Sequence, residues 1–100
     1  MRLIALYKTP PDPEAFDRSY FQTHLPLLRQ VPGLERTVVT RFLRTVMGEG
    51  LYLMAEMHFP DEGTLKAALK TPQMAEAGKN LATFAEGLVS LMWGSEVPAS

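Results

Sequence analysis

The chain has 100 residues and is 46% hydrophobic, which is typical of one folded domain; we expect that domain over residues 1–97, with a loose tail at 98–100. Its 10 basic and 11 acidic residues give a net charge of −1, which argues against nucleic-acid and membrane partners, since both need a basic surface. The chain contains no cysteine, so disulfides and thiolate chemistry are excluded.

The first predicted element is an inner β-strand at residues 2–8. Leu3, Ala5 and Tyr7 alternate with Ile4 and Leu6, so both faces of the strand carry apolar side chains that need cover. The apolar run in MRLIALYK is too short for a signal peptide, and no stretch approaches membrane-spanning length. We therefore expect a cytoplasmic protein.

A helix should begin directly after the following PPDP turn. Asp12 suits the N-cap, Pro13 suits the first helical position, and Glu14 places a negative charge at the positive end of the helix dipole. Pro26 has no N–H and disfavours helical angles at Leu25, which predicts a kink or break there. Pro32-Gly33 should end the segment.

One face of this predicted helix is apolar and carries a histidine. The residues of this face recur at spacings of three or four and are Phe16, Tyr20, His24, Leu27 and Val31. His24 is therefore expected on the buried side of the helix.

The remaining elements are two strands in a hairpin, a second helical region and a last strand. The strands are expected at 34–46 and 51–59 around the turn Gly48-Glu49-Gly50. The helical region should run from Pro60-Asp61 to about Glu86, with an interruption at Thr71-Pro72 where Thr71 caps the second segment. The last strand is expected at 88–97.

The order β-α-β-β-α-β predicts a ferredoxin-like α+β fold, in which one antiparallel sheet carries both helical regions on one face. The other face is then uncovered, although its strands carry large apolar side chains. Because soluble monomers rarely expose such a surface, we expect a homodimer that packs two sheets face to face into a dimeric α+β barrel.

The chain resembles the EthD family of dimeric α+β barrel proteins, named for a component associated with ethyl tert-butyl ether degradation. The resemblance is carried by an opening apolar strand, Pro32-Gly33-Leu34, a late helix with Phe84, and the block Phe16-Asp17-x-x-Tyr20-Phe21-x-x-His24-x-Pro26-Leu27. It implies a small cytoplasmic protein similar to cofactor-independent oxygenases, polyketide cyclases and muconolactone isomerases, with a pocket between the first helix and the sheet. It also implies a role for His24, with Tyr20 one turn before it, but it supplies no reaction.

His24 and Tyr20 are the candidate catalytic residues. A histidine exchanges protons near neutral pH, so His24 could move a proton at an activated carbon or a phenol while Tyr20 positions the ligand. The alternative is structural: the imidazole donates to a nearby carbonyl or contacts solvent at a packed helix edge.

The candidate ligand-binding residues are Tyr7, Phe16, Tyr52, Trp93 and Arg41. The aromatic members could form a pocket for a planar ligand, or they could simply be core. Arg41 could hold a substrate carboxylate, or it could pair with Glu56 across the hairpin.

We expect neither a metal nor another cofactor. Glu56 and His58 lie two residues apart on one face of a strand, but two ligands without a third make a poor metal site. Gly48-x-Gly50 is too short for a phosphate loop, and no nucleotide fingerprint is present.

The sequence thus predicts an EthD-like protein that binds a small oxygenated or aromatic molecule. One hypothesis is an enzyme, either a cofactor-independent oxidoreductase or monooxygenase or an isomerase or cyclase, that uses His24 for proton transfer. The alternative is a non-catalytic binding or carrier subunit that supports a separate oxygenase system.

Overall fold

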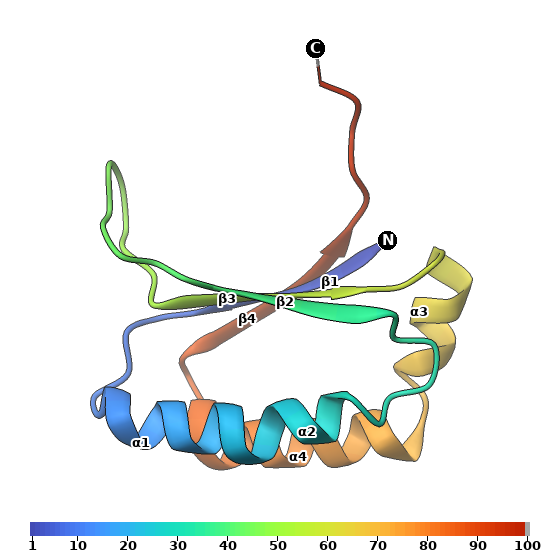
Figure 1. Cartoon of the computed structure of the whole chain (residues 1–100), viewed down its shortest axis with the longest axis horizontal. Helices are drawn as coiled ribbons and strands as arrows, with labels where there is room; N and C mark the ends of the chain where they lie inside the picture. The colour runs from blue at the N-terminus through green and yellow to red at the C-terminus, as the bar shows by residue number, and fades with distance from the viewer. Residues whose placement is uncertain (100) are drawn as a thin grey trace.

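The computed structural model of the chain describes residues 1–99, so Ser100, the last residue of the predicted tail, lies outside the described part. The elements in chain order are β1 (Arg2–Tyr7), α1 (Pro13–Asp17), the π-helix η1 (Arg18–His24), α2 (Leu25–Leu28), β2 (Arg36–Arg41), β3 (Leu53–His58), α3 (Glu62–Ala68), α4 (Pro72–Ala85) and β4 (Val89–Gly94) (Figure 1).

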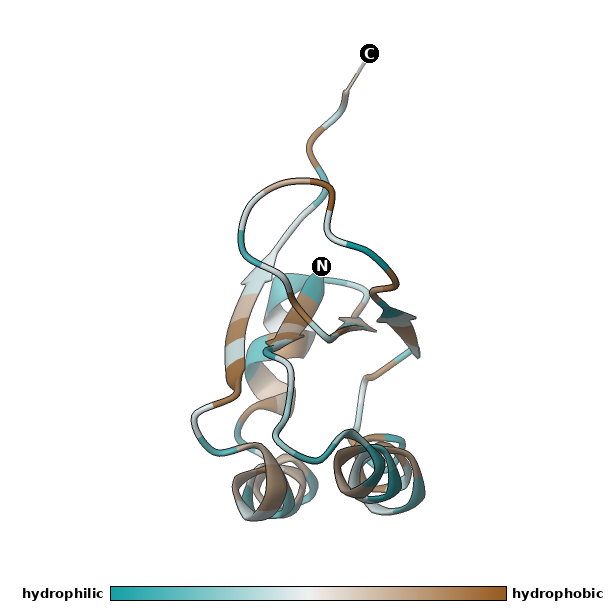
Figure 2. Ribbon diagram, turned by 90° about the vertical axis from the view of Figure 1, so that its left-hand side faces the viewer, coloured by the Kyte–Doolittle hydropathy of each residue, from teal (hydrophilic) through white to brown (hydrophobic). Residues whose placement is uncertain are grey.

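The four strands form one antiparallel sheet in the order β2-β3-β1-β4, so β1 is an inner strand as predicted. The first helical region and α4 lie side by side beneath the sheet (Figure 1, Figure 2). Leu3, Ala5 and Tyr7 point toward these helices and are buried. The predicted ferredoxin-like α+β fold is therefore confirmed.

The first helical region continues through Pro26, so the predicted kink or break is wrong. Leu25 has helical angles (φ −60°, ψ −43°), and its N–H donates to the carbonyl of Tyr20, five residues earlier. Pairing at five residues places Leu27 rather than Pro26 opposite the Gln22 carbonyl, and the wider turn gives the proline ring room. The helix therefore accommodates Pro26 through its π-helical register.

The predicted caps are confirmed. Asp12 accepts a hydrogen bond from the Ala15 N–H at 3.2 Å, and Thr71 accepts one from the Met74 N–H at 3.2 Å. Each cap stands immediately before a proline at the start of its helix, where the missing N–H has no intrahelical partner in any case.

The hairpin of β2 and β3 is confirmed, but its strands are shorter than predicted. Arg41 is paired with Leu53, and residues 42–52 form a loop instead of a tight turn at 48–50. Beyond Arg41 the Phe42 N–H still donates to the Tyr52 carbonyl at 3.1 Å, and the chain then leaves the ladder although its strand propensity stays high. Figure 1 shows this loop projecting on the side of the sheet opposite the helices.

The sheet face opposite the helices is apolar and uncovered in the monomer. It carries Ile4, Leu6, Val38, Met54 and Met92, of which Val38 and Met92 are 39% and 48% exposed. An ion pair between Arg2 and Glu56 at 2.7 Å lies on the same face. Soluble monomers rarely expose an apolar surface of this kind, which was the reason for predicting that a second copy covers it.

Candidate functional site

His24 lies at the end of η1 and is the one buried polar or charged residue of the described chain, with 3% of its surface exposed. Its Nδ1 lies 3.2 Å from the side-chain oxygen Oδ1 of Asn80, which comes from α4. Because an amide oxygen only accepts, Nδ1 carries the proton and Nε2 is left with a free lone pair. The neutral ring is therefore held in one tautomer.

Burial lowers the pKa of His24, and the hydrogen bond to Asn80 offsets part of that effect. The imidazole is thus neutral at pH 7, because the charged form is the one that burial disfavours. A neutral imidazole with a free Nε2 is suited to accept a proton from a bound molecule.

A cavity of about 60 Å³ lies between the sheet, the first helical region and α4. His24 and Tyr7 are the lining residues with polar side-chain groups, and the others are Gly, Ala, Leu and Met. A larger surface hollow of about 280 Å³, beside Leu25 and Arg29, is lined by no histidine. The His24 cavity is therefore the candidate site.

Several aromatic rings pack around His24. Its ring lies 5.5 Å from that of Tyr20 and 5.7 Å from that of Phe84, measured between centroids. The ring of Tyr7 lies 5.6 Å from Tyr20 and 5.3 Å from Phe16. These ring contacts, together with the hydrogen bond to Asn80, restrict the orientation of the imidazole.

Tyr20 is fully buried, and its hydroxyl has no hydrogen-bond partner within residues 1–99. Burial raises the pKa of Tyr20 to about 12, so the phenol stays protonated. Tyr20 does not line the cavity. Its ring therefore supports His24, while Tyr7 is the tyrosine that borders the cavity.

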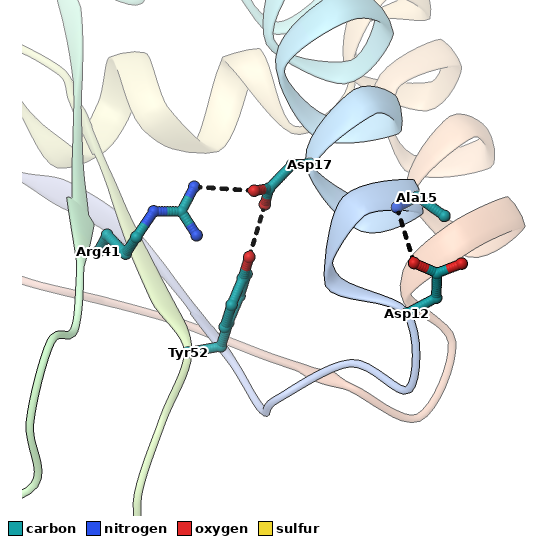
Figure 3. Close-up of polar contacts among 5 residues, drawn as sticks. All are labelled: Asp12, Ala15, Asp17, Arg41 and Tyr52. Atoms are coloured by element: carbon teal, nitrogen blue, oxygen red, sulfur yellow. Dashed lines mark hydrogen bonds and ion pairs between the residues drawn. The ribbon is translucent and has the colours of Figure 1, made fainter.

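Arg41 and Tyr52 are joined by Asp17 of α1 (Figure 3). The Tyr52 hydroxyl donates to Oδ1 of Asp17 at 2.8 Å, and Nη2 of Arg41 lies 3.1 Å from Oδ2. The Arg41 guanidinium also lies 5.0 Å from the centre of the Tyr52 ring. This cluster links the first helix to the end of the β2–β3 hairpin.

The predicted pairing of Arg41 with Glu56 is wrong. Arg41 is opposite Leu53, which is buried under the helices, whereas Glu56 pairs with Arg2 on the other face of the sheet. Directly opposed residues share a face, so the strand register separates the two side chains. The guanidinium pairs with Asp17 instead.

Trp93 lies apart from the aromatic cluster. Its Nε1 donates to Oε2 of Glu62 on α3 at 3.2 Å, and 43% of the residue is exposed. The structure therefore brings together Tyr7, Phe16, Tyr20 and His24, with Tyr52 at the edge of the group through its contact with Phe16.

The sequence reasoning missed Asn80 and gave Asp17 no role. Asn80 lies 56 residues from His24 along the chain, so no spacing relates the two. The one available signal was that Asn80 is the single asparagine of the chain and lies in a predicted helix, where asparagine is not favoured.

No group of three or more His, Asp or Glu that could hold a metal ion occurs among residues 1–99. Within the same residues, no helix has both the length and the apolar character needed to cross a membrane.

Comparisons with known proteins found close similarity over most of the chain. The family model described as EthD domain matches residues 8–87. A crystal structure of an EthD family protein from Bacillus halodurans is 45% identical, with a TM-score of 0.90, and the match covers 96% of this chain and 97% of that one.

Two further proteins extend the comparison. An uncharacterised 11.0 kDa protein from the thcB–thcC intergenic region of Rhodococcus erythropolis is 29% identical over 97 residues, which are 95% of this chain and 93% of that protein. A dimeric protein of unknown function with a ferredoxin-like fold, from Bacteroides fragilis, is 19% identical at a TM-score of 0.63, with 91% and 90% of the two chains covered. The latter similarity shows the fold alone.

Proposed function

This chain belongs to the EthD family, and on that premise we propose that it binds a small, largely apolar, oxygen-bearing molecule at the His24 cavity and that His24 transfers a proton to or from it. The observation that carries the proposal is the tethered imidazole. Its Nδ1 is engaged by Asn80 at 3.2 Å, and the residue borders a cavity that is otherwise almost entirely apolar. A buried titratable group that borders a cavity and has a shifted pKa is a candidate for a functional site.

In this proposal Nε2 of His24 removes a proton from a hydroxyl or an activated carbon of the bound molecule. The protonated ring is stabilised while it exists, because its Nδ1–H still donates to Asn80. The apolar lining excludes water and binds the hydrocarbon part of the ligand. Tyr7 borders the same cavity, and in this proposal it orients an oxygen of the ligand.

Removal of a proton from an activated carbon leaves a carbanion, and two reaction classes can follow from it. One is isomerisation or cyclisation, and the other is cofactor-independent oxidation of the carbanion by oxygen. The oxidative option draws support from the resemblance to cofactor-independent oxygenases. The alternative function is a binding or carrier subunit for a separate oxygenase, in which the same cavity holds the ligand and His24 anchors its hydroxyl.

The test compares the two histidines of the chain. Wild type, His24→Ala and His58→Ala are screened with phenols, lactones and short ketones, with and without oxygen, for turnover and for ligand-induced change in melting temperature. His58 lies on β3 and does not border the cavity, so its variant is the matched control.

Turnover that is lost in His24→Ala and kept in His58→Ala supports an enzyme. A melting shift that needs His24 but brings no turnover supports a carrier. If no compound in the panel distinguishes His24→Ala from wild type, the proposal is wrong.

We further propose that the molecule is a homodimer in which the apolar sheet faces pack together. Val38 and Met92 lie exposed on this face, and the loop of residues 42–52 projects on the same side of the sheet (Figure 1). This loop includes the exposed residues Val46 and Met47. The dimeric description of the Bacteroides fragilis protein lends support. Val38→Glu should yield monomers by light scattering, and a wild type that scatters as a monomer would contradict the arrangement.

The proposed location is the cytoplasm, which is what the resemblance to the EthD family implies.

A further inference from the structure

The His24 cavity is too small to enclose a ring. Its volume is about 60 Å³, whereas a cavity of about 150 Å³ is what holds a benzene molecule in a protein core. A bound molecule of more than a few atoms must therefore extend out of the cavity.

The open side of the cavity lies between α4 and the edge strand β4. Gly78 on α4 and Leu91 on β4 both line the cavity and are both exposed, Leu91 by 52%. The lining residues of β1 and β3, by contrast, are buried beneath the helices. The part of a bound ligand that extends out of the cavity would therefore pass between Gly78 and Leu91.

Neither the backbone conformation nor close packing requires a glycine at position 78. It lies inside the 14-residue helix α4, where glycine is less favourable than any residue except proline. Its φ is not positive, and a Cβ built on it would meet no heavy atom within 4 Å. What the missing side chain leaves is open space at the rim of the cavity.

We propose that Gly78 keeps open the entrance to the His24 cavity, and that the bound molecule is slender, with a small oxygen-bearing head at His24 and an apolar arm that leaves between α4 and β4. The inference rests on the proposed function for the identity of the head group. The arm contacts apolar side chains only, since Met74, Leu81 and Leu91 flank the opening. A straight-chain alcohol has this shape, whereas a fused ring system does not.

The entrance can be tested without any ligand because the chain has no cysteine of its own. Met57 lines the cavity from β3 and is buried, so Met57→Cys places a single thiol inside. Its modification by methyl methanethiosulfonate is followed by mass spectrometry. Adding Gly78→Leu should slow the reaction by roughly tenfold or more, since thiol reactivity follows access.

The matched control is Glu76→Leu in the same cysteine background. Glu76 is exposed on α4 and lies on a different face of the helix from Gly78, away from the cavity lining. If the thiol reacted at the same rate in the Gly78→Leu and Glu76→Leu proteins, the proposal that Gly78 forms the entrance would be wrong.

The ligand shape is tested with 1-butanol, 1-hexanol and 1-octanol, whose affinity is measured by isothermal titration calorimetry. The ring signals of His24 in NMR spectra then report whether the bound head group lies at His24. In wild type and Glu76→Leu, affinity should rise roughly fourfold for each methylene that becomes buried. In Gly78→Leu this dependence on chain length should disappear, and its persistence would overturn the proposal.

The two proposals fail differently. Alcohols that bind without moving the His24 signals contradict the proposed function, while the thiol experiment still decides whether Gly78 forms the entrance.

Discussion

The tether between Asn80 and His24 can be tested by changing what faces Nδ1 of the imidazole. Asn80→Asp puts a carboxylate where an amide oxygen now lies 3.2 Å from that nitrogen. Asn80→Leu removes the acceptor and keeps a side chain of similar size. The two substitutions should move the pKa of His24 in opposite directions.

The size of the effect follows from distance and exposure. Unit charges 4 Å apart interact by about 4 kcal/mol at an effective dielectric of about 20, which corresponds to about three pKa units. Residue 80 is only partly buried, so water reduces the effect, and we expect the pKa of His24 to rise by about one to two units in Asn80→Asp. In Asn80→Leu it should fall, because the hydrogen bond that offsets burial is gone.

The assay is an NMR titration of the histidine ring signals. The chain has two histidines, and His58 on β3 serves as the internal reference because it does not contact Asn80. Nitrogen shifts report which ring nitrogen of His24 carries the proton in each protein. Wild type should show Nδ1 protonated and a pKa below the usual value of a histidine.

Two results would contradict the proposed tether between Asn80 and His24. One is a wild-type His24 that is protonated on Nε2, because the free lone pair would then not be where the proposed chemistry needs it. The other is an unchanged titration of His24 in Asn80→Asp, which would show that the side chains do not meet.

Three further outcomes are expected. Because burial lowers the folded-state pKa of His24 below its unfolded value, the unfolded chain binds a proton at His24 at higher pH than the folded chain does. The free energy of unfolding of wild type should therefore fall relative to that of His24→Gln as the pH drops below about 6.5, by at most about 1.4 kcal/mol per pH unit. Denaturant titrations measure this difference, and an equal pH dependence in the two proteins would contradict the expectation. Asp17→Ala removes the acceptor of the Tyr52 hydroxyl and an exposed ion pair, so it should lower the free energy of unfolding by about 2 kcal/mol and Tm by roughly 8–15 °C. This loss should be smaller in a Tyr52→Phe background. An equal loss in both backgrounds would show that the two side chains are not coupled. Gly78→Ala meets no neighbouring atom and should stabilise α4 by about 0.8–1 kcal/mol, raising Tm by roughly 4–8 °C in calorimetry, and a destabilised variant would mean that the glycine is needed by the fold.

Local signals were enough to place the elements of the fold. The caps at Asp12 and Thr71 and the alternation in β1 are properties of short stretches, and each predicted element type is confirmed. The errors lie where an element depends on what surrounds it. The strand after Leu34 is shorter than its propensity suggests because its partner begins only at Leu53. The helix continues past Pro26 because it can widen to a π-helical register.

The amino-acid pattern was sufficient to predict that His24 is buried on the inner face of the first helix, because helical periodicity assigns residues to faces. It also determined the order of strands and helices, and with it the fold. The residues that those faces contact follow from how the elements pack together. Asn80 reaches His24 from a helix 56 residues away, and Arg41 pairs with Asp17 because strand register sets it on the opposite face from Glu56. Pairings of this kind depend on how packed elements align, and no local pattern in the chain records that alignment.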